Sequence, residues 1–280
     1  MPKRTDTTQQ RYDLPYWQSE DQSIYVYNTE CCGWMDRVYA PFGDLIFADP
    51  PFNIGHKYDQ HQDTMTKDQY LEWTERWLTL SKKCLNPTGC IYVCSGSMYQ
   101  AEIKCLMDKV GFHWQNTIIW HYTFGPSQKV KFTPSWVAIH YATMSKANYT
   151  WNQPAIKIPS ARQLKYNDKR AKSGGKTPDN VWILDPSQYE ECFQDHQDST
   201  LESRVCGTFK DRTGHPAQMP TAIVERCLLA SSNEGDLILD PFLGSGTTAK
   251  ACQHLKRRCV GLELSQMYLD NYTIPRLEKS

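Results

Sequence analysis

An apolar run at residues 44–48 leads directly into Asp49-Pro50-Pro51-Phe52, which is an acid, two prolines and an aromatic ring. Asp49 and the carbonyl of Pro50 could accept both hydrogens of an amino group on a planar base, drawing its nitrogen towards tetrahedral geometry and exposing the lone pair. Because Pro50 and Pro51 fix φ and lack N–H groups, the corner is rigid and offers only acceptors. Phe52 would stack on the base, an interaction of ~1–3 kcal/mol. We expect all four residues to be catalytic.

An ordinary Asp-Pro turn at the end of a strand is the competing interpretation of this corner. Folding alone rarely needs a second proline and an aromatic residue after a strand-end acid, so we favour the chemical role. A base would have to leave its helix to reach such a site. Catalysis there would consist mainly of positioning and hydrogen bonding, without a covalent nucleophile.

A second motif, DLILDPFLGSGTT at residues 236–248, contains a glycine turn beginning at Gly244. The turn fits the G-x-G-x-x-A form of a nucleotide-binding loop, and Glu263 ends the next strand at a distance suited to gripping ribose hydroxyls. Asp240, at the mouth of the turn, would repel a pyrophosphate but attract an ammonium or sulfonium group. Too few residues follow Glu263 for the second half of a dinucleotide domain. These features favour S-adenosylmethionine over NAD.

Strand-like and helix-like segments alternate along the chain and would position both motifs. Apolar runs predict strands at 24–27, 44–48, 90–96, 115–122, 136–143, 236–240 and 259–264. Capping residues and helical periodicity predict helices at 66–85, 97–111, 220–232 and 247–256. The alternation predicts an α/β fold with a doubly wound, mostly parallel, Rossmann-like sheet.

Regular alternation breaks down in the middle of the chain, so we divide the sequence into four parts. Residues 1–20 form a polar N-terminal tail and 21–143 a catalytic half. Residues 144–205, rich in Asn, Gln, Ser, Pro and Lys, form a small inserted recognition lobe. Residues 206–280 form a cofactor-binding half.

Composition limits the class of protein. The 280 residues carry 31 Lys and Arg against 31 Asp and Glu, so any surface that binds a polyanion must be a local patch. No apolar run approaches the ~20 residues of a membrane span, and the polar start lacks the apolar stretch of a secretory signal. We expect a cytoplasmic, nucleoid-associated protein without a membrane partner.

The eleven cysteines include no C-x-x-C pair and lie mostly in apolar stretches, which is typical of a reducing compartment. A zinc site formed by Cys192, His196, Cys206 and His215 is conceivable. Their spacing fits no familiar ligand pattern, so we predict no metal.

Together, these motifs resemble those of amino-directed DNA methyltransferases. DPPFNIG resembles the family's catalytic D-P-P-Y-N motif, and GDLILDPFLGSGTT resembles its S-adenosylmethionine motif. Further matches are GKTPDNVW at 175–182, HPAQMP at 215–220 and RRCVGLEL at 257–264. A catalytic motif first, an insertion in the middle and a cofactor motif last is the order of the circularly permuted β class. The resemblance spans about residues 24 to 270 and implies the S-adenosylmethionine-dependent methyltransferase fold.

The resemblance also implies a set of cofactor contacts. These residues are Asp240, Phe242, Gly244, Ser245, Gly246, Thr247, Glu263, Glu30, His215 and Gln218. A lone histidine such as His215 is more often a helix-start or core residue, so its role is the weaker expectation.

Three positions depart from the family pattern. Phe52 replaces the commoner tyrosine but keeps the stacking face. Met219 stands where the family often has lysine, which removes a contact to the cofactor carboxylate. Glu30 would replace an Asp of the family from a shifted position, unless that contact is absent.

Residue types also bear on the atom that is methylated. No Pro-Cys pair occurs, which argues against C5-cytosine chemistry. Family members whose motif opens with Asp, as at Asp49, mostly modify adenine N6, and those that open with Ser favour cytosine N4. We predict a site-specific DNA methyltransferase that makes N6-methyladenine. The alternatives are an N4-cytosine enzyme, an RNA base N-methyltransferase and a catalytically inactive DNA-binding module.

Basic residues in and near the insertion are candidates for contacts to double-stranded DNA. Between Lys146 and Lys176 there are eight Lys or Arg residues against one acid. The phosphate candidates are Lys129, Lys131, Lys165, Lys169, Arg170 and Lys176. A solvated loop whose charge only keeps it soluble is the other interpretation. Relatives also suggest a homodimer, whereas the target sequence and any restriction endonuclease partner cannot be read from these residues.

Overall fold

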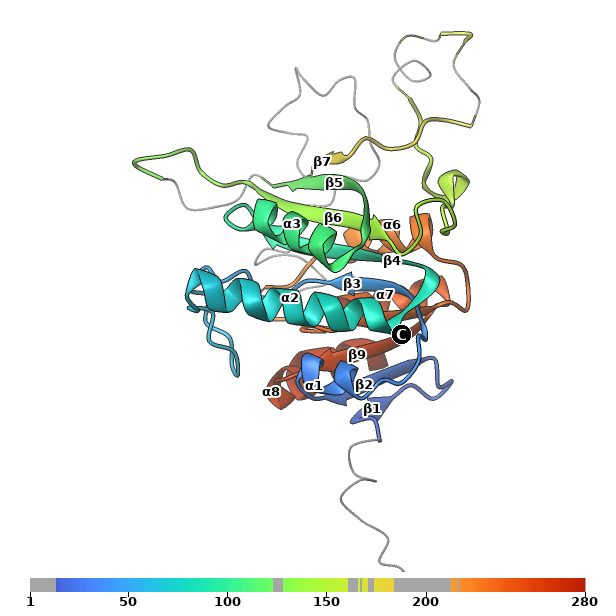
Figure 1. Cartoon of the computed structure of the whole chain (residues 1–280). Coiled ribbons are helices and arrows are strands. Elements are labelled where there is room, and N and C mark those ends of the chain that lie inside the picture. The colour runs from blue at the N-terminus through green and yellow to red at the C-terminus, as the bar shows by residue number, and fades with distance from the viewer. Residues whose placement is uncertain are drawn as a thin grey trace, which may run out of the picture.

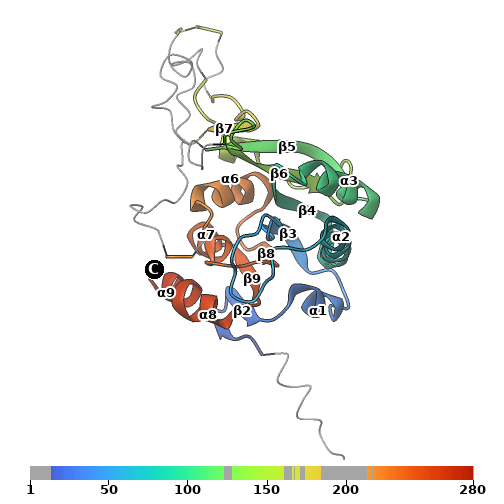
Figure 2. The same cartoon turned by 90° about the vertical axis from the view of Figure 1, so that its left-hand side faces the viewer.

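A nine-stranded sheet in the order β1-β2-β9-β8-β3-β4-β6-β5-β7 organises the computed structural model (Figures 1 and 2). The structure describes residues 14–122, 128–160, 166, 168–170, 174–183, 213–215 and 217–279. The strands are β1 (Trp17–Gln18), β2 (Ile24–Asn28), β3 (Gly43–Ala48), β4 (Leu85–Gly96), β5 (His113–His121), β6 (Trp136–Thr143), β7 (Val181–Ile183), β8 (Leu237–Asp240) and β9 (Arg258–Glu263).

Helices cover both faces of this sheet. They are α1 (Cys31–Asp36), α2 (Lys67–Cys84), α3 (Gln100–Val110), α6 (Thr221–Ser231), α7 (Thr247–Leu255), α8 (Gln266–Tyr268) and α9 (Ile274–Glu278), with the 3-10 helix η2 (Gln153–Ile156) and the π-helical turn η4 (Leu269–Thr273). Figure 2 shows α1, α2 and α3 on one face and α6, α7 and α9 on the other. The predicted doubly wound architecture is therefore confirmed.

Strand direction also agrees with the prediction. Along the series β2-β9-β8-β3-β4 each strand pairs in parallel with the next, whereas β6 runs antiparallel between β4 and β5. Strands buried on both faces are apolar along their whole length, and β3 and β4 each carry such a run between the two helix layers.

Local signals in the sequence explain the helix boundaries. Thr66 and Gln69 form the expected capping box at the start of α2. Gly111 ends α3 in the left-handed conformation, with φ of 88°. In the order β2-β9-β8-β3, two adjacent strands of the second predicted half lie between two strands of the first, so residues 21–143 and 206–280 share one sheet.

Two of the predicted segments contribute strands to the sheet. Trp17 and Gln18, in the predicted N-terminal tail, form β1 and pair antiparallel with β2. The insertion at 144–205 contributes β7, which pairs in parallel with β5 and extends the sheet. No helix among the described residues is long and apolar enough to cross a membrane.

Candidate active site

The catalytic motif and the glycine turn meet at one edge of the sheet. Strands β3, β8 and β9 run parallel, so their carboxyl ends present Asp49, Asp240 and Glu263 at the same edge. A cavity of about 570 Å³ lies there and is lined by residues of both motifs. The separate stretches at 49–52 and 240–248 therefore form a single site.

The charge of this cavity is uniform in sign. Four carboxylates line it, from Glu30, Asp49, Asp240 and Glu263, whereas no Lys or Arg is among the described lining residues. Such a site favours a cationic ligand and disfavours a pyrophosphate. This negative charge argues against an NAD site.

Burial changes the acid strength of two of these groups. Burial, reinforced by the nearby Asp240, raises the pKa of Asp49 to about 7. Burial also raises the pKa of Asp240 to about 7, with a further contribution from Glu263, although hydrogen bonds from Thr248 and Phe242 oppose the rise. Neither aspartate has a positive partner among the described lining residues, so a bound cation would stabilise their charged forms.

Neighbouring helices and strands hold the DPPF corner rigidly. The hydroxyl of Tyr70 in α2 donates a 3.0 Å hydrogen bond to the carbonyl of Pro51. Phe52 lies against Gly96 at the end of β4, where an added Cβ would be 3.2 Å from the ring carbon Cδ2. Any larger residue at Gly96 would displace the ring.

Asp63 organises the loop that follows the corner. Its carboxylate, which is 2% exposed, accepts hydrogen bonds from the amides of Asn53, Ile54 and His56 at 2.7, 3.1 and 2.8 Å. The side chain of Asn53, whose φ is 56°, exchanges two hydrogen bonds with the backbone of Met65. The backbone directly after Phe52 is thus fixed from the far end of its own loop.

The glycine turn is tied to the end of β9. Glu263 accepts hydrogen bonds from the amides of Gly244 and Ser265, each at 2.8 Å, so both carboxylate oxygens are oriented by backbone. Gly244, Ser245 and Thr247 line the cavity. Gly244 adopts a φ of 52°, a conformation that L side chains rarely adopt.

Two residues of this motif contribute in another way than expected. Gly246 is not part of the described lining, and a Cβ there would be 2.9 Å from Cγ2 of Thr273, so its glycine serves close packing. Phe242 lines the cavity, but its ring also packs on Trp73 and Trp77 of α2, with centroids 5.7 and 5.3 Å away.

His215 and Gln218 both line the cavity, as the resemblance implies. The amide of Ala217 donates to Nδ1 of His215, so in the neutral ring the proton is on Nε2. Burial, together with His56, lowers the pKa of His215 to about 4 and keeps the ring neutral. Nε2 lies beside Gly244 and is buried without a partner among the described residues, as is Nε2 of His56. A hydrogen-bond donor is therefore available to a ligand near the glycine turn.

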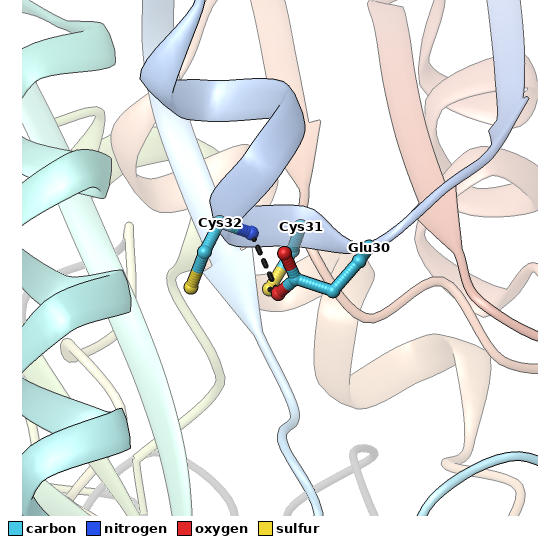
Figure 3. A group of neighbouring side chains, drawn as sticks. All are labelled: Glu30, Cys31 and Cys32. Carbon is cyan, nitrogen blue, oxygen red and sulfur yellow. Dashed lines mark hydrogen bonds between the residues drawn. The ribbon is translucent and has the colours of Figure 1, made fainter.

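Glu30 lines the cavity but also acts as the N-cap of α1. Its carboxylate accepts from the amides of Cys32 and Gly33 at 2.9 and 2.7 Å, and Figure 3 shows it turned back onto the helix start. Burial alone would raise the pKa of Glu30, but these hydrogen bonds outweigh it and lower the pKa. Glu30, Cys31 and Cys32 lie close enough together to hold a metal, yet the cap already accounts for the carboxylate. We assign no metal here. Of the zinc candidates, Cys192, His196 and Cys206 lie outside the described residues.

The phosphate candidates lie in two places. Lys129 and Lys131 are exposed on the loop between β5 and β6. In the insertion, Lys169 is exposed, Arg170 forms an ion pair with Asp168, and Lys176 forms one with Asp179. Lys165 lies outside the described residues.

Several lining residues were not predicted. They are chiefly aromatic or imidazole side chains, namely His56, Tyr58, His61, Trp73, Trp120, Tyr122 and Tyr268. Trp120 and Tyr122 close the predicted strand 115–122, so their position at the carboxyl edge was the available signal. The others come from a loop and from helices, where nothing local indicates the cavity.

Comparison with known proteins decides the family. The model of a DNA methylase family, which groups N6 and N4 methyltransferases, matches residues 43–274. The chain belongs to this family. The predicted resemblance is therefore confirmed.

Individual relatives agree with the family. The chain is 34% identical over 228 residues to the Type II methyltransferase M.HpaI of Haemophilus parainfluenzae, covering 81% of this chain and 66% of that protein. It is 29% identical over 243 residues to the DNA adenine methyltransferase YhdJ of Escherichia coli (strain K12), covering 84% and 76%.

Solved structures share the fold. The M1.HpyAVI–SAM complex aligns with a TM-score of 0.62 at 22% identity, covering 91% of this chain and 98% of that one. The cytosine-N4-specific PvuII DNA methyltransferase aligns with a TM-score of 0.67 at 16% identity, covering 95% and 89%.

Proposed function

We propose that this protein transfers a methyl group from S-adenosylmethionine to the exocyclic N6 of adenine in DNA. One observation carries the proposal: a single cavity joins the DPPF corner to the glycine turn and is lined by four carboxylates without a described Lys or Arg. Family membership supports methyl transfer to DNA. The methyl donor is supported by the cavity's preference for a cation and by the SAM complex of the fold relative M1.HpyAVI.

The cavity residues fit S-adenosylmethionine chemically. Asp240 would face the positively charged amino-acid end, and Glu263, held by two amides, would accept from the ribose hydroxyls. The Nε2 hydrogen of His215 would donate to the carboxylate of the methionine part, taking over the contact that Met219 cannot make. When bound, the cofactor supplies an electrophilic methyl group on a sulfonium that is already a good leaving group.

The chain's own part in the reaction is to hold the amino group. Asp49 and the carbonyl of Pro50 would accept the two hydrogens of the flipped adenine's amine, while Phe52 stacks on the ring. Tyr70 and Asp63 keep this corner still, so little reorganisation is needed during transfer. After the nitrogen gains the methyl group it must lose a proton, and an oxygen of Asp49 would accept it.

Adenine is favoured over cytosine by two observations. The catalytic motif opens with Asp49, as in adenine-specific members, and the relative YhdJ is a DNA adenine methyltransferase. The fold relative PvuII methyltransferase is specific for cytosine N4, so the fold itself does not select the base.

The test is a nucleoside analysis after incubation with isotopically labelled S-adenosylmethionine. Purified protein would be mixed with duplex genomic DNA or with transcripts, and the digested nucleosides would be measured by mass spectrometry. Label in N6-methyladenine from DNA is the expected result. Label in N4-methylcytosine would show that cytosine N4 is the methylated atom. Label only in transcripts would show that the substrate is RNA. Cofactor binding without any label would indicate a catalytically inactive module.

A further inference from the structure

The loop between β5 and β6 leaves the sheet beside the cavity. His121 pairs with Trp136 at the end of the antiparallel β5–β6 ladder, and Val137 pairs with Gly96, the residue on which Phe52 rests. Trp120 and Val137, from the same ladder end, line the cavity. Figure 1 shows the described part of this loop, residues 128–135, projecting from the end of the sheet where α2 begins.

The described tip of this loop, residues 128–133, alternates basic and apolar side chains. Its sequence is QKVKFT, and the amide of Gln128 donates to the Thr133 hydroxyl at 3.3 Å, which closes the tip. Val130 is 92% exposed and Phe132 is 98% exposed. Solitary exposed apolar residues are common, but this phenylalanine is 98% exposed, follows two lysines, and stands on a loop whose base adjoins the cavity. Both the charge and the shape of the tip suit a duplex.

We propose that this tip enters duplex DNA when the target base is extruded, an inference that rests on the proposed function. Phe132 fills the space that the base vacates and stacks on its former neighbours, as apolar wedges do between base steps. Lys129 and Lys131 contact the flanking phosphates. The partner is therefore double-stranded DNA at the point of base flipping.

Other exposed residues of the described surface are less well placed to contact DNA at the cavity. Tyr39 is 101% exposed, but it precedes β3 and so lies at the edge of the sheet opposite the cavity. In the insertion, Asn152 bonds the carbonyl of Ala230 near the end of α6, which is again the far edge. Ile54, which is 60% exposed, lines the cavity itself and has exposed Lys57 nearby, but Ile54 is an aliphatic residue on the lining. Within the described chain, the β5–β6 tip differs in carrying an almost fully exposed aromatic ring next to basic residues on a loop that starts beside the cavity.

The test compares Phe132→Ala with wild type on two duplexes that carry a methylation site mapped beforehand with wild-type protein. One duplex is fully paired, and the other has a mismatch opposite the target base, which lowers the cost of extrusion. We expect Phe132→Ala to lose roughly tenfold or more in kcat on the paired duplex and to recover most of this loss on the mismatched one, because less energy is needed to flip a mismatched base. Phe132→Leu should retain much of the activity.

Controls separate this proposal from folding and from the proposed function. Tyr39→Ala removes an equally exposed aromatic side chain from the far edge and should match wild type on both duplexes. Equal activity of Phe132→Ala and wild type on the paired duplex, or an equal loss on both duplexes, would overturn the wedge while leaving the methyltransferase intact. Failure of the wild type to methylate any DNA would overturn the proposed function and the wedge together.

Discussion

Asp49, which is half-buried, and Asp240, which is buried, belong to different motifs, yet each raises the question of why a fold shields an acid from water without a cation beside it. Neither has a cationic partner among the described residues that line the cavity, and both have pKa values near 7. Asp240 still accepts a 2.9 Å hydrogen bond from the amide of Phe242, which orients it. The fold therefore maintains two carboxylates whose charge is stabilised when a cation is bound, as expected for a binding site rather than a core.

Replacing Asp49 should separate chemistry from cofactor binding. We expect Asp49→Asn to reduce methyl transfer at least roughly 100-fold, since the amide cannot accept both the amine hydrogen and the departing proton in the same way. Cofactor affinity should change far less, because Asp240 and Glu263 remain. Isothermal titration with S-adenosylmethionine and single-turnover methylation would measure the two quantities. Turnover close to wild type would exclude Asp49 as the acceptor.

Burial of Asp240 should make stability depend on pH. The pKa rises from about 4 in the unfolded chain to about 7 in the fold, so the fold disfavours ionisation and stability is lost as pH rises through this window. Asp240→Asn removes this penalty, which is at most roughly 4 kcal/mol. Without cofactor, urea unfolding should show a larger gain for the variant at pH 8 than at pH 5. A gain of the same size at both pH values would contradict the burial argument.

At the scale of elements, the sequence predicted those segments whose signals are local. Helix α2 carries its own capping box at Thr66 and Gln69, and α3 ends at a left-handed glycine. Helix α1 was missed because its six residues are defined by the Glu30 cap rather than by apolar periodicity. Strand β7 was missed because three residues become a strand only through pairing with distant β5.

In the candidate site, too, the sequence predicted the residues with local signals and missed those that depend on distant contacts. Motifs at strand ends, such as Asp49 and Glu263, were found because parallel strands present their carboxyl ends at one edge. The packing need at Gly246 could not be predicted, since an added Cβ there would meet Thr273, which is 27 residues away along the chain. Tyr70 and Asp63 act through hydrogen bonds across 19 and 10 residues, which no spacing rule indicates.

The loop after the catalytic corner gives a prediction at this scale. Asp63→Asn keeps size but exchanges an acceptor oxygen for an amide donor, so some of the three backbone amides of residues 53–56 lose their partner. We expect kcat to fall roughly tenfold or more because the corner is no longer held, with little change in cofactor affinity. The matched control is Asp68→Asn, at an exposed first-turn position of α2. A variant with unchanged kcat would show that Pro50 and Pro51 alone hold the corner.

At the scale of the whole molecule, interleaved strands explain how distant segments act as one site. Strands β8 and β9 lie between β2 and β3, so the cofactor and catalytic motifs cannot separate as domains would. The described part of the insertion crosses the far edge of the sheet before β7 pairs in parallel with β5, and Figure 1 shows its described residues at 157–160 and 174–176 lying apart from the β5–β6 loop. DNA bound at the cavity would therefore meet the β5–β6 loop before the described part of the insertion.

Salt dependence should distinguish these two basic regions. Removing a lysine that neutralises one phosphate should reduce the slope of log affinity against log salt by about 0.9. Lys129→Ala with Lys131→Ala should therefore lower the slope by roughly 1.8 if each lysine neutralises one phosphate. Lys169→Ala with Arg170→Ala, a double variant of equal charge, should change it less, because Asp168 already neutralises Arg170. Fluorescence anisotropy with duplex DNA across a salt series gives both slopes. A larger change in slope for the Lys169/Arg170 variant would assign the phosphate contacts to the insertion at residues 144–205.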